Sequence, residues 1–314
     1  MILLGDIGGT NCRLVLIKDK KKKFIALKVY KSRLFKNLYE VIENYLKEIS
    51  NLIEEKIKIA VLAVAGPVLN KEAYLTNLNW KVSSEELKKK FDFKKVLLFN
   101  DLEALVGCID FLKKEELILL KSGPTFRKFP KSFLALGTGL GEATLIKKRP
   151  LIILPTEAGH TFFSPLKEEE WNFLKFLEEK GEELSWEKVI SGKALSLWYE
   201  FFYKEKKSPE EITFLAKNGD SSSLKVVFKV LELIGRKISQ TALSSLPWGG
   251  IYLAGGVILG IKNFLIDKEG YSFFQRGFLE NFKMKYLLER FPVYVITHPF
   301  PGLLGVLSIL RNRL

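Results

Sequence analysis

The segment Leu3-Leu4-Gly5-Asp6-Ile7-Gly8-Gly9-Thr10 leads into the run Arg13–Lys18 near the start of the chain. A related segment, Phe133–Gly141, leads into Ala143–Lys148. Both segments predict a strand, a glycine turn, a second strand and a charged turn. A hairpin that occurs twice in one chain indicates two similar α/β halves.

Helical and continuously apolar segments alternate after the first hairpin. Apolar residues follow a helical spacing over Asn37–Ile53, and Ser83 or Ser84 precedes a second predicted helix. Residues 58–64 and 95–99 are almost continuously apolar, as buried strands are. Strands that alternate with helices favour a largely parallel sheet, so the predicted fold class is α/β.

The second half carries the longer helical segments. Helical spacing covers Val189–Tyr203 and Leu224–Leu243, and a final helix is predicted at 303–310. Strands are predicted at 249–257 and 293–297. The repeat of the hairpin places the boundary between the halves near residue 108.

The composition excludes several classes of protein. The chain has 314 residues, of which 47% are hydrophobic and 27% charged, so it can bury a sizeable core and is not disordered. No apolar run approaches the ~20 residues of a membrane span, and Asp6 interrupts the first apolar stretch, so neither a membrane partner nor a signal peptide is expected. Cys12 and Cys108 are too few for a disulfide framework or a four-cysteine zinc site. We therefore expect a soluble, cytoplasmic protein without a structural metal.

The net charge of +14 raises the question of a nucleic-acid partner. The lysines gather in short runs at 20–23, 88–90 and 204–207, without the interleaved aromatic residues that bind single strands. Such runs are typical of solvated faces, and a surface for polyanions is the alternative. We expect no nucleic-acid partner.

The two glycine turns are suited to bind phosphate. Glycine lets backbone N–H groups approach phosphate oxygens because no Cβ intervenes. Asp6 is suited to hold a hydrated Mg²⁺ beside those phosphates, and Thr10 adds a hydroxyl donor. Turns from two halves would clamp a nucleoside triphosphate, and Gly255-Gly256 would let its base or ribose lie against the backbone. The alternative for each is an ordinary turn that needs glycine.

Asn100-Asp101 follows the predicted strand at 95–99, where ligands of open α/β sheets bind. Aspartate suits a general base, and the neighbouring amide can orient a hydroxyl. The alternative is a helix N-cap, because residues 102–106 have a helical pattern and either residue type caps well.

Glu157 and His160 lie close together in the sequence. A carboxylate and an imidazole recognise vicinal hydroxyls, the first by accepting and the second by donating hydrogen bonds. A structural histidine is the alternative. For Glu187, which precedes a predicted helix, the alternative is a capping role.

These motifs together resemble the bacterial glucokinase family, a branch of the hexokinase group with the two-domain actin-like ATPase (ribonuclease H-like) fold. The motifs that carry the resemblance run through the whole chain: Gly5–Asn11, Ala65–Pro67, Thr76-Asn77 with Trp80, Asn100-Asp101, Gly137–Gly141, Glu157–His160, Glu187 with Ser191-Gly192, Ala254–Gly256 and Pro301–Gly305. Two positions depart from the family pattern. Glu142 stands where a small or apolar residue is frequent, and Ala158 stands where glycine is common.

The resemblance implies a central cleft, with a small α/β domain over 1–108 and 299–314 and a large α/β domain over 109–298. It implies a glucokinase that uses ATP and Mg²⁺ to convert glucose to glucose 6-phosphate, the first step of glycolysis. Asp101 would be the catalytic base, and Asn100, Glu157, His160 and Glu187 would bind the sugar together with it. The nucleotide would lie against two groups of residues: Gly5, Asp6, Ile7, Gly8, Gly9 and Thr10, and Gly137, Thr138, Gly139, Gly255 and Gly256.

Two other functions stay open from the sequence. One is a kinase for another hexose, such as mannose or fructose, and the other is a sugar-sensing regulator with a decayed active site. The presence of Asp101 and of both glycine turns favours an active enzyme. The lack of cysteine near His160 argues for the branch of the family without a zinc motif. A homodimer is left open.

Overall fold

The computed structural model describes residues 1–18, 23–53, 55–75, 78–124, 127–148 and 150–313. It divides into two compact units, which are Met1–Lys114 with His298–Leu314 (unit 1) and Glu115–Thr297 (unit 2). The domain boundaries expected from the sequence lie at 108/109 and 298/299. Thr76, Asn77 and residues 20–22, which the motifs and the first lysine run include, lie outside the described residues.

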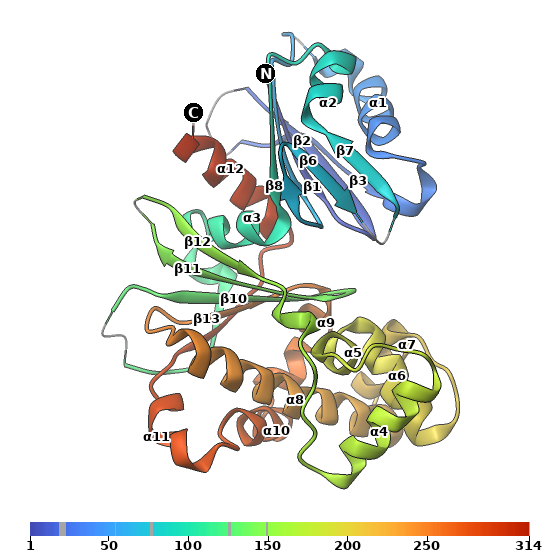
Figure 1. Cartoon of the computed structure of the whole chain (residues 1–314), viewed down its shortest axis with the longest axis vertical. Helices are drawn as coiled ribbons and strands as arrows, with labels where there is room; N and C mark the ends of the chain where they lie inside the picture. The colour runs from blue at the N-terminus through green and yellow to red at the C-terminus, as the bar shows by residue number, and fades with distance from the viewer. Residues whose placement is uncertain (19–22, 54, 76–77, 125–126, 149, 314) are drawn as a thin grey trace. The chain divides into compact units, whose positions relative to one another are not determined.

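Unit 1 is built on a five-stranded sheet of order β3-β2-β1-β4-β8 (Figure 1). Its strands are β1 (Ile2–Ile7), β2 (Asn11–Ile17), β3 (Ile25–Lys31), β4 (Ile59–Val64) and β8 (Lys95–Asn100). The first three strands are antiparallel neighbours, and β1, β4 and β8 run parallel. A second, three-stranded sheet consists of β5 (Val68–Leu69), β6 (Glu72–Leu75) and β7 (Trp80–Ser83).

Helices cover both faces of the five-stranded sheet, with α1 and α2 on one face and α3 and α12 on the other (Figure 1). These helices are α1 (Leu38–Glu48), α2 (Ser84–Phe91), α3 (Asp101–Gly107) and α12 (Pro301–Arg313). Leu3 and Leu62 share a core with the apolar face of α1, whereas Leu4 and Val61 pack with α12. Successive strand residues point to opposite faces, so coverage on both sides explains the continuous apolar runs. The predicted helix at Asn37 is confirmed, with Asn37 as its N-cap.

The crossing of α12 and α3 depends on a glycine. A Cβ added at Gly305 would lie 1.4 Å from the carbonyl oxygen of Ala104, so only glycine lets the two backbones approach this closely. The segment Pro301–Gly305, which closes the family resemblance, thus packs against the helix that begins at Asp101.

Unit 2 repeats this strand pattern in its sheet, of order β12-β11-β10-β13-β14-β9. Its strands are β9 (Leu117–Lys121), β10 (Lys131–Leu136), β11 (Leu140–Lys147), β12 (Ile152–Thr156), β13 (Ile251–Ala254) and β14 (Val293–Ile296). As in unit 1, three antiparallel strands that include the glycine hairpin adjoin two strands that run parallel to the first of them. Unit 2 adds β9 as an antiparallel edge strand. The repeat inferred from the sequence is therefore confirmed.

The helical part of unit 2 packs around one long helix, α8 (Figure 1). Its helices are α4 (Glu168–Glu179), α5 (Trp186–Ile190), α6 (Gly192–Tyr203), α7 (Pro209–Lys217), α8 (Ser221–Ser245), α9 (Gly256–Ile266), α10 (Lys268–Phe278) and α11 (Lys285–Leu288). The single helix predicted over Val189–Tyr203 is wrong, because the backbone is extended at Ser191 and Gly192 donates its N–H to the Gly137 carbonyl at 2.8 Å. Within the described parts of the chain, no helix has the length and apolar content that a membrane crossing requires.

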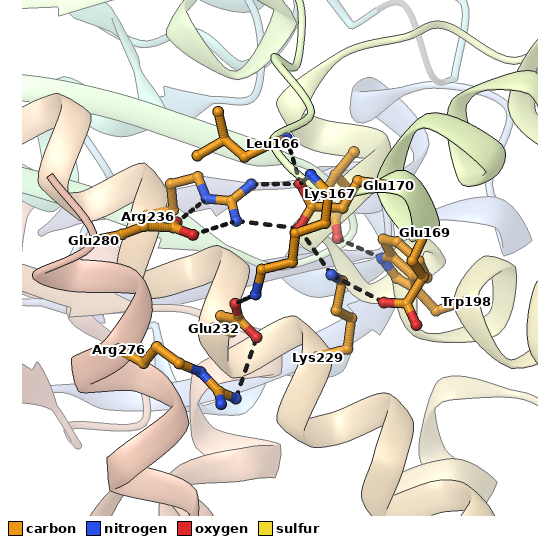
Figure 2. Close-up of polar contacts among 11 residues, drawn as sticks. Leu166, Lys167, Glu169, Glu170, Trp198, Lys229, Glu232, Arg236, Arg276 and Glu280 are labelled. Carbon is orange, nitrogen blue, oxygen red and sulfur yellow. Dashed lines mark hydrogen bonds and ion pairs between the residues drawn. The ribbon is translucent and has the colours of Figure 1, made fainter.

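An ionic cluster lies between α4 and α8, and we call it the Glu170 cluster (Figure 2). Glu170 is fully buried and accepts hydrogen bonds from Lys229 at 2.8 Å and from Arg236 at 2.7 Å. Arg236 also pairs with Glu280, and Lys229 with Glu169. The remaining charged members are Lys167, Glu232 and Arg276. Buried charges are tolerated only when they are paired in this way.

Candidate active site

The first glycine turn joins β1 to β2 in unit 1. Its N–H at Gly8 donates to the Asn11 carbonyl at 2.9 Å. Gly5 lies earlier, inside β1, where a Cβ would be 2.6 Å from a methyl group of Leu62, and Ile7 is buried in the core. Of the residues from Gly5 to Thr10, those at Gly8–Thr10 therefore form the turn, and Gly5 and Ile7 pack the strand that carries it.

Asp6 lies two residues before this turn, in β1, opposite Arg13 in the β1–β2 register. Its carboxylate accepts a hydrogen bond from Arg13 at 3.0 Å. Burial raises the pKa of Asp6, and the Arg13 guanidinium opposes that rise. A Cβ at Gly302, in the first turn of α12, would lie 2.8 Å from the carboxylate. The Asp6 carboxylate thus occupies the space that a side chain at Gly302 would otherwise fill.

Ser32 fixes the first glycine turn through two hydrogen bonds, and no motif in the sequence indicated this role. Its hydroxyl donates to the Gly8 carbonyl at 2.7 Å, and its backbone N–H donates to the Thr10 carbonyl at 3.0 Å. The residue is fully buried, and Cys12 lies 3.4 Å from its hydroxyl. A single serine beyond β3 carries no local signal, because the turn that it contacts lies more than twenty residues earlier in the chain.

Asn100 and Asp101 lie where β8 passes into α3. The Asn100 side chain accepts from the Leu102 N–H at 2.9 Å and donates to the Gly66 carbonyl at 3.0 Å. Asn100 is therefore the helix N-cap that the sequence offered as an alternative, although its amide has a second N–H that these bonds do not use. One Asp101 carboxylate oxygen accepts from the same Leu102 N–H at 3.0 Å. Both side chains lie at the carboxyl end of a parallel strand.

The second glycine turn joins β10 to β11 in unit 2 and is in contact with Glu187. The Gly137 N–H donates to the Gly139 carbonyl at 2.9 Å, and nothing lies within 4 Å of a Cβ added at Gly137. A Cβ at Gly139 would lie 2.4 Å from a Glu187 oxygen, which accepts from the Leu140 N–H at 3.0 Å. The alternative role of Glu187 as a cap of α5 is wrong, because Ser185 is the N-cap residue and Glu187 is directed to the turn.

His160 lies near the other two residues of unit 2 that are predicted to bind the sugar. It ends a short 3-10 turn, Ala158–His160, and its Nδ1 lies 3.1 Å from a Glu183 oxygen. This hydrogen bond and the negative charges of Glu187, Glu183 and Glu157 raise the pKa of His160. Glu157 and Glu187 therefore lie close enough to His160 to act on its charge, and Glu187 also contacts the second glycine turn.

Gly255 and Gly256 differ in what surrounds them. Gly255 has a φ of +103° and a Cβ there would lie 2.2 Å from the Leu136 carbonyl, so the turn into α9 requires glycine. Gly256 is exposed, and nothing lies within 4 Å of a Cβ added to it. Since Leu136 precedes Gly137, the Gly255 turn adjoins the second glycine turn.

The two residues that depart from the family pattern, Glu142 and Ala158, each have a hydrogen-bond or ion-pair partner in the structure. Glu142, in β11, is buried and pairs with buried Lys237 of α8 at 2.9 Å, so the additional carboxylate has its own counter-ion. The carbonyl of Ala158 accepts from the Thr161 hydroxyl at 2.8 Å.

The cysteines take no part in a metal site among the described residues. Cys12 and Cys108 are buried and belong to no disulfide, and burial raises the pKa of Cys12 to about 11. In the same ranges, no three His, Cys, Asp or Glu side chains gather as ligands of one ion.

The repeated α/β units with their glycine hairpins have the actin-like ATPase fold, which solved glucokinases and a ROK hexokinase share. A sequence model of the glucokinase family matches residues 3–313, and the chain belongs to this family. It is 30% identical over 318 residues to a glucokinase of Marinobacter nauticus, which covers 99% of this chain and 97% of the relative.

Two solved structures extend the comparison of folds. The glucokinase of Balamuthia mandrillaris in complex with glucose is 23% identical, with a TM-score of 0.85 over 99% of this chain and 93% of that chain. A ROK family glucokinase from Streptomyces griseus in complex with glucose and AMPPNP is 16% identical, with a TM-score of 0.64 over 98% of each chain.

Proposed function

We propose that this chain transfers the γ-phosphoryl group of ATP to glucose and so forms glucose 6-phosphate and ADP. Membership of the glucokinase family over nearly the whole chain carries this conclusion. The placement of Asp101 at the end of β8 agrees with it, as does the gathering of Glu157, His160 and Glu187 beside a glycine turn. A kinase for another hexose and a regulator with a decayed site are not favoured.

We place the nucleotide phosphates against the two glycine turns. Gly8 and Gly9 in one turn and Gly137 in the other offer backbone without side chains, whereas Gly139 lies against the Glu187 carboxylate. The residues also fit Mg²⁺, because this ion is usually held by one or two carboxylates together with substrate phosphates, and Asp6 provides a carboxylate beside a turn. When bound, Mg²⁺ would neutralise charge on the transferred phosphoryl group.

In the proposed reaction, Asp101 accepts the proton of the attacking sugar hydroxyl. A base must come within ~3 Å of that hydroxyl to do so. The hydrogen bond from Leu102 fixes one oxygen of Asp101, which orients the carboxylate. The unused N–H of Asn100 donates to a sugar hydroxyl, Glu157 and Glu187 accept from hydroxyls, and His160 donates to one.

A coupled assay with ATP and Mg²⁺ tests this function. Glucose, mannose and fructose are compared as acceptors, and glucose is expected to give the highest kcat/KM. A zinc-specific chelator that leaves Mg²⁺ in place is expected to change neither the rate nor the melting temperature. Binding of glucose without phosphorylation of any hexose would favour the regulator instead.

The proposal places the enzyme in the cytoplasm, where ATP is available. Light scattering of the purified protein distinguishes a monomer from the homodimer that the sequence leaves open.

Ser32→Ala tests the first glycine turn as a nucleotide site. The change removes the hydroxyl donor of the half-buried Gly8 carbonyl, which costs about 0.5–1.5 kcal/mol and loosens the turn. We expect the KM for ATP to rise about tenfold, the equivalent of about 1.4 kcal/mol, with the KM for glucose nearly unchanged. Initial rates with each substrate varied in turn measure both constants.

Cys12→Ala is the matched control, because it removes the other neighbour of the Ser32 hydroxyl and keeps the bond to Gly8. An equal rise of both KM values in Ser32→Ala would mean that Ser32 only supports the fold.

A further inference from the structure

Two segments of unit 2 are tied together next to His160. The Phe163 N–H donates to the Leu184 carbonyl at 2.9 Å, and the Trp186 N–H donates to the Thr161 carbonyl at 3.1 Å. The rings of Phe163 and Trp186, both buried, meet edge to face with centroids 4.8 Å apart. The backbone on which His160 and Glu183 sit is therefore fixed, although both side chains reach solvent.

Glu183 is held on one oxygen by two donors. His160 Nδ1 lies 3.1 Å from this oxygen, and the hydroxyl of buried Ser185 donates to it at 2.9 Å. Burial raises the pKa of Glu183, but the hydrogen bonds from His160 and Ser185 outweigh this and lower it. The carboxylate is thus ionised at neutral pH and can only accept hydrogen bonds.

The state of the imidazole follows from this partner. Because Glu183 accepts only, His160 Nδ1 carries a proton, and Nε2 is the ring nitrogen left to meet a ligand. The charged groups that act on the ring are Glu183, Glu187 and Glu157, all of them acidic, and Lys188 acts on Glu183. The surroundings therefore favour an imidazolium, in which Nε2 also donates.

We propose that Glu183 is a positioning residue that orients His160 so that its Nε2 donates a hydrogen bond to a sugar hydroxyl. The inference rests on the proposed function, and it adds a residue that no motif indicated. Glu157 and Glu187 are proposed to accept from hydroxyls, so a donor near them completes the recognition of neighbouring hydroxyl groups. Glucose affinity then falls as pH rises through the raised pKa of His160, because the donor is lost.

The chain has two histidines, which makes the ring of His160 directly observable. In protein labelled with ¹⁵N-histidine, two imidazoles titrate, and a His298→Gln variant assigns them. We expect Glu183→Gln to lower the pKa of His160 by about half a pH unit, the size expected of a half-exposed charge pair. At pH 7 we expect the KM for glucose to rise about threefold with kcat nearly unchanged, as for loss of a contact used in ground and transition states alike.

Glu182→Gln is the matched control, because the neighbouring Glu182 pairs with Lys188 and Lys193 and not with His160. It is expected to change neither the pKa of His160 nor the KM for glucose. An unchanged pKa of His160 in Glu183→Gln, or a lowered pKa with an unchanged KM, would overturn the role of Glu183 in an active kinase. A wild-type protein that phosphorylates no hexose would overturn the proposed function as well, and the two failures are thereby distinguished.

Discussion

Asp101→Asn is expected to lower kcat for glucose phosphorylation by at least ~10²-fold, the usual size of a general-base effect. An amide cannot accept the proton of the sugar hydroxyl. It can still accept the hydrogen bond from the Leu102 N–H, and Asn100 remains the helix N-cap, so the fold loses little. The melting temperature should therefore stay nearly unchanged. Steady-state kinetics and thermal unfolding of the same preparation measure both quantities.

Glu157→Gln provides the contrast for this experiment. Glu157 is proposed to hold a hydroxyl in the ground state and the transition state alike, so its loss should raise the KM for glucose and change kcat far less. If Asp101→Asn keeps a near-normal kcat, or unfolds the protein, the catalytic assignment is wrong and Asp101 only stabilises the start of α3.

Glu170→Ala is expected to lower the free energy of unfolding by about 3–5 kcal/mol, because it leaves Lys229 and Arg236 buried without their shared carboxylate. Chemical denaturation measures this loss. Glu168→Ala is the matched control, since Glu168 lies in the same first turn of α4 and is exposed. A loss no larger than that of the control would show that the Glu170 cluster contributes nothing to stability.

The contribution of Glu170 also depends on pH. Burial raises its pKa, but hydrogen bonds from Arg236 and Lys229 outweigh burial and lower the pKa from 4.5 to about 2. A carboxyl group with a lowered folded-state pKa stabilises the fold fully above its unfolded pKa, and this contribution is lost as pH falls towards the folded value. The difference in unfolding free energy between wild type and Glu170→Ala should therefore narrow between pH 4.5 and pH 2. If the difference in unfolding free energy stayed constant over that range, the pKa of Glu170 would not be lowered by Arg236 and Lys229.

Local patterns predicted the elements that depend on neighbours in the sequence. The hairpins at Gly8 and Gly137, the helix after Asn37 and the strand before Asn100 each follow from spacing and turn residues within a few positions. The repeated hairpin also predicted two similar α/β halves, and the two sheets do share the order of their hairpin and parallel strands.

Contacts between distant segments could not be predicted in this way. The break at Ser191 arises because Gly192 bonds to Gly137, more than fifty residues earlier in the chain. The orientation of Glu187 depends likewise on Leu140. Family resemblance named Glu187 as a site residue, but it did not indicate the hydrogen bond that directs its carboxylate to the glycine turn.

The return of α12 to unit 1 bears on the order in which a nascent chain can fold. Residues 1–114 leave the ribosome before α12 has been synthesised, so Leu4 and Val61 at first lack the apolar side chains of Leu303 and Leu307 that later cover them. Unit 2, by contrast, is continuous in sequence and can complete its core as soon as residue 297 has emerged. Unit 1 thus exposes the part of its sheet that α12 later covers throughout the synthesis of unit 2, which is the period in which a chaperone would be of use to this chain.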